Sequence, residues 1–308
     1  MIRKDKGYTP EVATKLVEME VNTMLKLGSH PCLVNLVSAN KAICCYKKVD
    51  SVLKDGINGE TKNYVAVREE VNYIILEKCM NGSLSKYVKN TGPMEELVTR
   101  FFFTQLCSAV HFMHTEEFVH LDIKLDNILL DEWYNLKLAD LGIALCAKGT
   151  SGYLAHRRGT NRYMAPEVDK ASTKAPYNAF KADLYSLGVV LHLMLFGTYP
   201  DSNQDEEKST GDCHSDEEMT DDQVSDLQGM DEKLSSNVSE ECMDLLNALL
   251  SLTASKRPSM EQVMSHPWMA QEFPENISET VYSEMSARAE YLKGVANEAE
   301  CALSITLD

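Results

Sequence analysis

Apolar residues recur at helical spacing near both ends of the chain and in its middle. Between Glu11 and Leu27 this spacing predicts an amphipathic helix that ends at Gly28. The same pattern predicts a long helix from Glu95 to His114. Further helices are expected at Ser239–Leu250, Met260–Met264 and Ser278–Ala302.

The region between the first two helices has the pattern of β-strands. From Leu36 to Tyr73 this pattern is interrupted by residues 54–59, whose Asp-Gly and Asn-Gly pairs favour a hairpin turn. The run Tyr73–Leu76 predicts a buried strand. Short strands are also expected within Val119–Leu130 and Leu136–Leu141.

Two segments follow neither pattern. The run Leu187–Phe196 is almost wholly apolar, is too short to span a bilayer and contains His192, so it predicts a buried core helix. Residues 201–231 are rich in Asp and Glu, contain one lysine and have almost no apolar face, which is the composition of a disordered segment. This segment is either an inert solvated loop or an acidic interaction region.

Composition narrows the class of protein. A chain of 308 residues has room for one or two domains, and its net charge of −17 argues against nucleic acid as the main partner. The nine cysteines show no paired metal spacing, which favours reduced thiols in the cytoplasm, with the nucleus as an alternative. No apolar run follows the first positive charges, so neither a signal peptide nor a membrane partner is expected.

The run from His120 to Asn127, followed by Asp140-Leu141-Gly142, carries the most informative chemistry. Asp122 can accept a proton from a hydroxyl, and Lys124 can neutralise a phosphoryl group as it moves. Asn127 and Asp140 offer the hard oxygen ligands that Mg²⁺ takes beside nucleotide phosphates. Together these residues predict a site for phosphoryl transfer.

These residues resemble the catalytic loop and the metal-binding motif of eukaryotic protein kinases. Further motifs follow in that family's order: Gly159-Thr160, Ala165-Pro166-Glu167, Asp183 to Gly188, Lys256-Arg257-Pro258 and His266-Pro267-Trp268. Lys124, two residues after Asp122, is typical of serine/threonine specificity, and Thr160 lies in the loop that would receive the substrate residue. The closing motifs look most like those of the calcium/calmodulin-dependent and AMP-activated-like groups.

The resemblance implies an α+β, bilobal kinase-like fold with an incomplete small β lobe. The small lobe would cover residues 1–78 with an inserted hairpin. The large, mainly helical lobe would cover 79–269, and a helical tail 270–308. The implied function is that of an ATP- and Mg²⁺-dependent serine/threonine protein kinase acting on protein substrates, with Arg257 paired to Glu167.

The resemblance also assigns residues to the nucleotide. Leu76 would stand beside the adenine, and Glu77 and Cys79 would offer backbone groups to its edge. Ser83 stands where the family often has a carboxylate for the ribose, so that contact would be weaker. The resemblance also assigns Asp126, Leu129 and Asp140 to nucleotide binding.

The chain departs from the family pattern in three places. No glycine-rich loop or strand lysine precedes the first helix, so the printed start is either an internal methionine or the beginning of a protein that lacks these strands. The glutamate that pairs with this lysine maps to Glu20, with Glu18 as the alternative. Leu121 replaces an arginine that clamps phosphorylated activation loops, and Leu141 replaces the phenylalanine of the metal motif. Thr150 and Ser151 remain candidate phosphorylation sites.

Two other functional classes compete with the kinase. A pseudokinase scaffold would keep the large lobe without useful turnover, as the absent lysine and glycine loop favour. An adaptor would act through the acidic residues 201–231. For an active kinase, these carboxylates predict a preference for basic residues near the target Ser or Thr. The oligomeric state is left open by the sequence.

Overall fold

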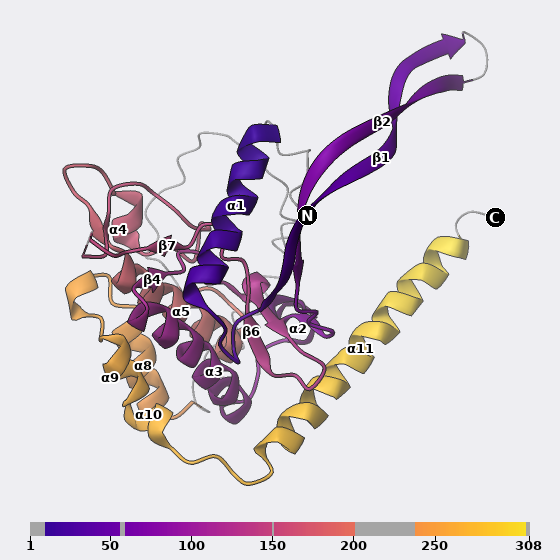
Figure 1. Cartoon of the computed structure of the whole chain (residues 1–308). Coiled ribbons are helices and arrows are strands. Elements are labelled where there is room, and N and C mark those ends of the chain that lie inside the picture. Colours follow the sequence, from indigo (N-terminus) through magenta and orange to yellow (C-terminus); the bar gives the residue numbers. More distant parts are fainter. Residues whose placement is uncertain (1–9, 56–58, 150, 201–237, 306–308) are drawn as a thin grey trace. The chain divides into compact units, whose positions relative to one another are not determined.

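The computed structural model describes residues 10–55, 59–149, 151–200 and 238–305, and gives the backbone alone for 10–14, 41–55, 59–72 and 296–305 (Figure 1). Thr150 and the acidic residues 201–231 lie outside the described residues. The chain divides into two compact units, Met1–Ser29 with Val34–Glu77, and His30–Leu33 with Lys78–Asp308. Residues 30–33 and 270–308 therefore belong to the second unit.

The first unit consists of one helix and a long hairpin. Helix α1 (Pro10–Leu27) confirms the predicted amphipathic helix, and it buries Met24 and Leu27. Strands β1 (Leu36–Asp55) and β2 (Gly59–Leu76) pair antiparallel, with the register shifting between Leu36 and Ser38 and again between Val49 and Ser51. Asp55 opposes Gly59, so the hairpin predicted from the Asp-Gly and Asn-Gly signals is confirmed.

Asn35 and Glu77 close the open end of this hairpin. The Glu77 N–H donates to the Asn35 carbonyl at 2.9 Å. The Asn35 side-chain amide donates to Glu77 Oε2 at 2.8 Å, and its backbone N–H donates to the same oxygen at 3.2 Å. The backbone of Glu77 is thereby fixed directly after the last strand residue, Leu76.

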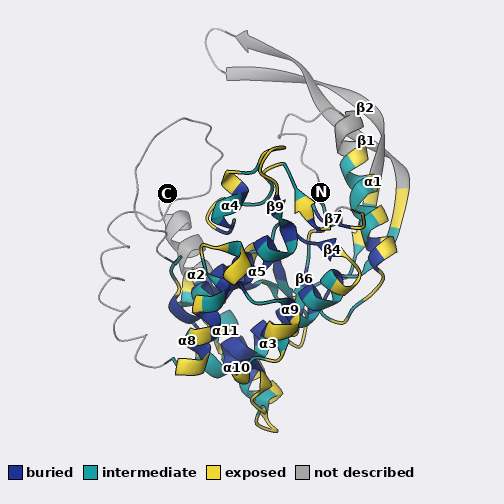
Figure 2. Ribbon diagram, turned by 90° about the vertical axis from the view of Figure 1, so that its left-hand side faces the viewer, coloured by how far each residue is buried: buried dark blue, intermediate teal, exposed yellow. Residues whose placement is uncertain are grey.

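The second unit is mainly helical. Among its described residues the helices are α2 (Leu84–Thr91), α3 (Glu96–Thr115), α4 (Pro166–Asp169), α5 (Ala179–Phe196), α8 (Glu240–Leu249), α9 (Met260–Met264), α10 (Pro267–Ala270) and α11 (Ile277–Ile305), with 3-10 turns η2 (Leu125–Asn127) and η3 (Ala254–Lys256). The predictions at 95–114, 239–250, 260–264 and 278–302 are confirmed by α3, α8, α9 and α11. Buried residues gather on α5 and its neighbours, and exposed residues lie at the outer edges (Figure 2).

Helix α5 lies in the core of this unit. Among the described helices it alone is long and apolar enough to cross a membrane, yet 83% of its 18 residues are buried inside the protein. It begins at Ala179, well before the apolar run at Leu187, so the helix is longer than the run that predicted it. Its burial confirms the predicted core helix. A Cβ on Gly188 would lie 2.9 Å from the Leu249 Cβ, so the glycine lets α8 approach α5 closely.

Short strands bring the loops of this unit together. Strand β3 (Gly82–Ser83) pairs with β5 (Ile128–Leu130), which pairs with β6 (Leu136–Leu138), all antiparallel. Two further pairs are β4 (Phe118–Val119) with β7 (Leu145–Cys146), and β8 (Tyr153–Leu154) with β9 (Tyr177–Asn178). The loop 120–127 therefore lies between two strands that are each held by a partner.

The long C-terminal helix α11 docks on the end of α2. The Arg288 guanidinium donates to the Thr91 hydroxyl at 2.6 Å and to the carbonyls of Gly92 at 2.9 Å and Pro93 at 2.7 Å. Its Nε donates to Glu284 at 3.0 Å. A cation at the carbonyl end of a helix is favourably placed against the helix dipole. Residues 270–308 thus include a helix with a specific anchor on the second unit.

Candidate active site

The loop after β4 is held by one buried carboxylate whose role the sequence did not reveal. Asp183, on the first turns of α5, accepts hydrogen bonds from the backbone N–H groups of His120 at 2.9 Å and Leu121 at 2.8 Å. Its Oδ2 also lies 2.9 Å from His114 Nε2. Asp183 is 1% exposed, so its desolvation is offset by these three partners. An acidic residue within a mainly apolar helix was the signal that could have revealed this role.

His120 fixes the start of the catalytic loop from inside the fold. The Asp122 N–H lies 3.2 Å from His120 Nδ1, and His120 Nε2 lies 3.1 Å from the Ala139 carbonyl. An N–H can only donate and a carbonyl can only accept, so the ring is the neutral tautomer protonated at Nε2. The imidazole thus joins the loop containing Asp122 to the strand that leads to Asp140.

Asp122, Lys124 and Thr160 form a closed set of polar contacts. The Thr160 hydroxyl donates to Asp122 Oδ1 at 2.6 Å, and Lys124 Nζ donates to the same hydroxyl at 2.8 Å. Lys124 Nζ also lies 3.0 Å from Asp122 Oδ2. Burial pushes the pKa of Asp122 upward, but the hydrogen bond from Thr160 and the charge of Lys124 outweigh it, so the pKa is lowered. Asp122 is therefore ionised at neutral pH.

Asn127 has its side chain oriented by the same loop. Its Nδ2 donates to the Asp122 carbonyl at 2.9 Å and to Asp122 Oδ2 at 3.1 Å. Both contacts use the amide nitrogen, so the amide oxygen is directed elsewhere. The Asn127 carbonyl accepts from the Ala139 N–H at 2.8 Å, which brings Asn127 beside Asp140.

Asp140 occupies a turn with a left-handed backbone. Its φ is +65°, a region that few residues other than glycine adopt, and its Oδ1 accepts from the Gly142 N–H at 3.3 Å. Asn127 and Asp140 thus supply one amide oxygen and one carboxylate from neighbouring segments. Two hard oxygen donors suit Mg²⁺, which completes its coordination with phosphates and water. No cluster of three His, Cys, Asp or Glu residues with metal-binding geometry occurs in the described part of the chain.

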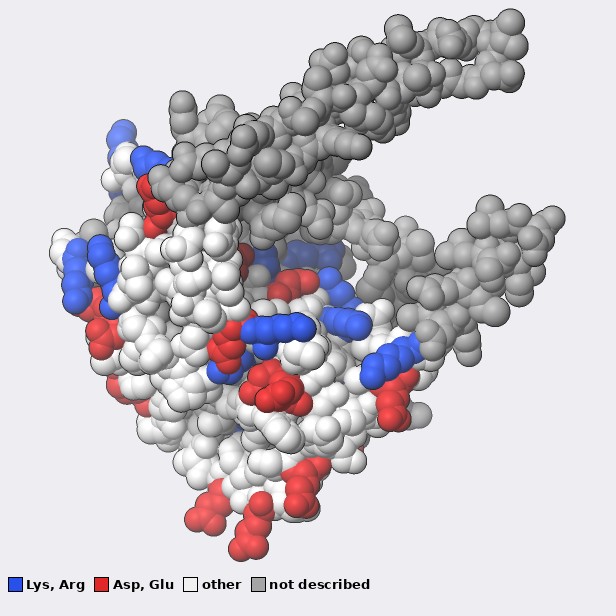
Figure 3. Space-filling view, turned by 45° about the vertical axis from the view of Figure 1, so that its right-hand side comes forward, with Lys and Arg blue, Asp and Glu red and all other residues white. Residues whose placement is uncertain are grey.

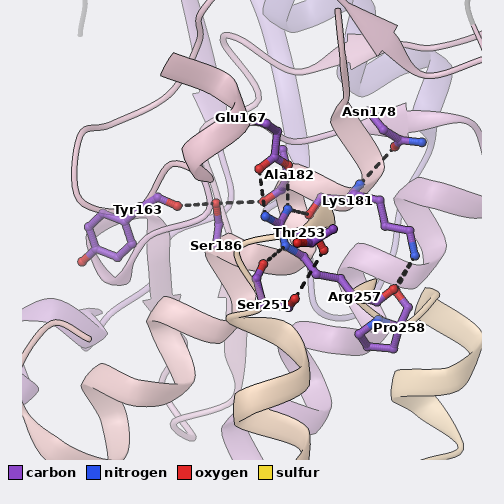
Figure 4. A network of polar contacts seen from close by, with 10 residues as sticks. All are labelled: Tyr163, Glu167, Asn178, Lys181, Ala182, Ser186, Ser251, Thr253, Arg257 and Pro258. Carbon is purple, nitrogen blue, oxygen red and sulfur yellow. Dashed lines mark hydrogen bonds and ion pairs between the residues drawn. The ribbon is translucent and has the colours of Figure 1, made fainter. Parts of the chain in front are cut away.

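The segment that carries Thr160 is anchored far from the loop by Arg257. The buried guanidinium donates to Glu167 Oε1 at 2.7 Å and Oε2 at 2.8 Å, which confirms the predicted pair (Figure 4). It also donates to the Ser251 and Lys181 carbonyls, at 2.8 Å each. Ser186 donates to the Tyr163 carbonyl at 2.8 Å. These contacts join α4, α5 and residues 251–258 behind the site.

A family model for the protein kinase domain matches residues 2–269. The chain belongs to the protein kinase family. The described residues fit this assignment, with a helical large lobe and a small sheet region, so the predicted kinase fold is confirmed.

Several curated proteins are similar to this kinase domain. The cell cycle serine/threonine-protein kinase CDC5/MSD2 of Saccharomyces cerevisiae is 36% identical over 221 residues, 69% of this chain and 28% of that protein. The serine/threonine-protein kinase PLK4 of Danio rerio is 31% identical over 265 residues, 86% of this chain and 25% of that protein. The testis-specific serine/threonine-protein kinase 2 of Mus musculus is 31% identical over 210 residues, 67% of this chain and 54% of that protein.

The chain therefore spans between about a quarter and about half of the length of these relatives. All three carry the name of a serine/threonine kinase. None of the three names mentions the calcium/calmodulin-dependent or AMP-activated kinases, so that narrower likeness is not confirmed.

The residues predicted to bind the nucleotide divide between the two units of the kinase domain. Leu76 and Glu77 belong to the first unit, at the end of β2. In the second unit, Ser83 opposes Leu129 across the β3–β5 pair, and both are partly buried. The Cys79 carbonyl accepts from the Gly82 N–H at 3.4 Å.

Asp126 differs from the other predicted residues of the second unit. Its carboxylate is 49% exposed and lies 3.9 Å from Lys89 Nζ on α2, whereas Asn127 beside it is buried. An exposed pair at this distance contributes little to stability. The Asp126 side chain is thus available to solvent.

On α1, Glu20 is half-buried and Glu18 is exposed, which favours Glu20 as the family's helix glutamate. The Leu121 side chain is buried at 6% exposure, with a φ of +67°. Leu141, which replaces the phenylalanine of the metal motif, is also buried. Both replacements therefore act as apolar packing residues.

Proposed function

We propose that this kinase domain transfers the γ-phosphoryl group of ATP to serine and threonine hydroxyls of proteins. One observation carries the proposal: a side-chain hydroxyl, that of Thr160, lies between the Asp122 carboxylate and the Lys124 ammonium, at 2.6 Å and 2.8 Å. An acceptor hydroxyl needs the same two neighbours. The relatives named as serine/threonine kinases support the same activity.

In this mechanism Asp122 accepts a hydrogen bond from the substrate hydroxyl. That hydrogen bond directs the hydroxyl oxygen toward the γ-phosphorus of ATP. The pKa of Asp122 lies below its usual range, so the carboxylate is a weak base. Phosphoryl transfer is largely dissociative, and little negative charge is needed on the attacking oxygen early in the step. Asp122 is therefore suited to orienting the hydroxyl and taking its proton late. Lys124 would balance charge on the transferring group.

Asn127 and Asp140 would hold Mg²⁺. The hydrogen bonds from Asn127 Nδ2 to Asp122 fix the amide so that its oxygen is the available ligand atom. The turn at Asp140 holds the second ligand by the contact with Gly142. When bound, Mg²⁺ supplies positive charge to the phosphate oxygens.

For the adenine we propose contacts with the segment after β2. The Glu77 N–H is committed to Asn35, so the contact we propose for Glu77 uses its carbonyl oxygen. Leu76, Cys79, Ser83, Asp126 and Leu129 keep the roles that the sequence predicted for them. The narrower kinase group, the preference for basic substrates and the cytoplasmic or nuclear location also stay predictions, and the preference rests on residues 201–231.

The first test is Asp122→Asn in the full-length protein. We expect kcat to fall by about a hundredfold or more, because the loss of a positioned acid–base group typically costs this much. Nucleotide affinity should be retained, since Asp122 acts on the hydroxyl. Radiolabelled phosphate transfer and calorimetric ATP titration measure the two quantities. Asp244→Asn is the matched control, because that carboxylate is 82% exposed and lies outside the site.

A rival proposal is a scaffold that binds partners without turnover. The closed set of Asp122, Lys124 and Thr160 favours the enzyme, since a scaffold has no need of an oriented carboxylate. Turnover by Asp122→Asn close to that of the parent would show that Asp122 is not the catalytic group. Absence of turnover in the parent, with nucleotide binding retained, would favour the scaffold.

A further inference from the structure

The segment beside the catalytic carboxylate carries a charge opposite to that of the whole chain. Between Leu141 and Pro166 the sequence has four basic residues and no Asp or Glu, whereas the net charge of the chain is −17. Thr160, in the middle of the basic part, touches Asp122. A peptide whose hydroxyl reaches Asp122 therefore meets positive charge.

Two of these basic residues lack an anionic partner among the described residues. The other arginines with described side chains bind acceptors: Arg100 the Gln271 and Glu272 carbonyls, Arg157 Asp169, Arg257 Glu167 and Arg288 Glu284. Arg158 and Arg162 make no hydrogen bond or ion pair with any residue that the structure describes. The Arg162 guanidinium lies 4.9 Å above the Tyr199 ring, which leaves its N–H edge for a ligand.

The backbone places both arginines close to the acceptor position. Arg158 and Arg162 lie two residues before and after Thr160, and two extended residues span about 7 Å. Gly159 has a φ of +112°, and a Cβ there would lie 2.6 Å from the Leu121 carbonyl oxygen. Arg162 has a φ of +66°, an unfavourable region for a residue with a long side chain. The turn is thus constrained on both sides of Thr160.

Some other basic side chains of the described residues lie next to acidic ones. On the face drawn in Figure 3, basic side chains in the middle lie next to acidic ones, so they neutralise one another. Pairs such as Lys89 with Asp126 illustrate this arrangement. The positive charge of an arginine without an acidic neighbour is not neutralised and can attract an anionic ligand.

We propose that Arg158 and Arg162 recognise an anionic side chain, a carboxylate or a phosphate, within about three residues of the acceptor Ser or Thr. The guanidinium is planar and donates paired hydrogen bonds that match either anion. This inference rests on the proposed kinase function and defines its substrate class as acidic peptides. It competes with the basic preference predicted from residues 201–231, and the Asp and Lys peptides of the test distinguish the two predictions.

The test compares peptides of one length that differ only beside the acceptor, carrying Asp, phosphoserine, Ala or Lys. kcat/KM is measured for the full-length parent, for Arg158→Gln/Arg162→Gln, and for Lys256→Gln/Lys293→Gln, which removes the same charge from exposed positions elsewhere. We expect the parent to prefer the anionic peptides. The arginine variant should lose about fivefold of that preference, because exposed charge pairs are individually weak. The lysine control should retain it.

The experiment distinguishes a carboxylate from a phosphate because the two groups carry different charges. A larger preference for phosphoserine than for Asp identifies phosphate as the favoured anion, and equal preference identifies any carboxylate as sufficient. Both preferences should weaken as salt is raised. An unchanged preference in the arginine variant, or an equal loss on all four peptides, would overturn the inference.

Peptide binding without ATP separates this inference from the proposed function. Fluorescence anisotropy of labelled Asp and Lys peptides reports recognition even if no phosphate is transferred. Tighter binding of the Asp peptide that depends on the two arginines, with no turnover, would sink the proposed function and support the inference. Turnover with equal binding of the Asp and Lys peptides would support the proposed function and overturn the inference.

Discussion

At the residue scale, two carboxylates organise the catalytic loop in different ways. Asp183 is buried and accepts from two backbone N–H groups and faces His114, so it fixes where the loop begins. Asp122 is partly buried and accepts from side chains, which hold it ionised. The Asp183 carboxylate thus binds the backbone of the loop, and the Asp122 carboxylate is available to a substrate.

The contact between Thr160 and Asp122 predicts a pH effect. Thr160→Val removes a hydrogen bond that lowers the pKa of Asp122, so that pKa rises. In the parent, ionised Asp122 stabilises the fold at any pH above its unfolded-state pKa. This contribution to stability is lost as the pH falls through the lowered pKa of the folded state. The acid limb of the kcat/KM profile should therefore move to higher pH in the variant. Thr160→Ser, which keeps the hydroxyl, should follow the parent, and coinciding profiles for all three proteins would contradict the prediction.

At the element scale, the large lobe is built by helices that approach α5 closely and by polar links between helix ends. Glu96, on the first turn of α3, accepts from the Trp268 indole at 2.7 Å and from the Ser239 hydroxyl at 2.6 Å. It also accepts from the Ser239 N–H at 2.7 Å, at the start of α8. One side chain therefore ties together three helices distant in sequence.

The close approach of α8 to α5 predicts that Gly188→Ala destabilises the protein. The added Cβ would meet the Leu249 and Leu250 side chains at 2.9–3.1 Å, and overpacking of a core typically costs about 1–3 kcal/mol. Gly294→Ala on α11 is the control, because nothing lies within 4 Å of its Cβ position. That change should stabilise slightly through helix propensity. Chemical denaturation measures both, and equal shifts would argue against the packing explanation.

The link between Glu96 and Trp268 makes a second prediction for these elements. Trp268→Phe keeps an apolar ring but removes the donor to the half-buried Glu96 carboxylate, which should cost about 1–3 kcal/mol of unfolding free energy. Trp133→Phe is the matched control, because the Trp133 side chain is 66% exposed. Its effect should stay within about 0.5 kcal/mol. Thermal unfolding followed by circular dichroism decides between a large and a negligible difference.

At the scale of the whole molecule, Arg257 connects the segment of Thr160 to the C-terminal part of the kinase domain. Its guanidinium contacts Glu167, Lys181 and Ser251, and the Lys181 ammonium donates back to the Arg257 carbonyl at 2.6 Å. Burial and the neighbouring Arg257 lower the pKa of Lys181. The segment that would hold the substrate is therefore supported by a buried polar network.

The ion pair between the buried Arg257 guanidinium and the partly buried Glu167 carboxylate predicts that Arg257→Gln lowers stability and activity together. Removing one partner leaves Glu167 without its cation, and breaking a buried pair typically costs about 3–5 kcal/mol. Arg157→Gln is the control for stability, because its pair with Asp169 is 50% and 62% exposed and should contribute less than about 1 kcal/mol. Urea denaturation of both variants gives the comparison. Similar losses in the two would show that burial does not distinguish these pairs.

The sequence by itself determined the family, the order of the catalytic motifs and most helices. Apolar periodicity and turn residues act over a few positions, so α1, α3, α11 and the hairpin could be predicted from local pattern. The pairing of Glu167 with Arg257 was also predicted, because the motifs that contain them have a known partner in the family. Local sequence patterns were therefore sufficient to predict those elements whose structure depends on residues close together in the chain.

The tertiary structure decided which distant side chains meet. The roles of Asp183 and Glu96 depend on contacts across 62 and 172 positions, respectively, which no local pattern encodes. The same holds for Arg158 and Arg162, since only the folded chain shows which cations already have partners among the described residues. A hydrogen bond forms between atoms a few ångströms apart in space, and the separation of its partners along the chain is set by the fold.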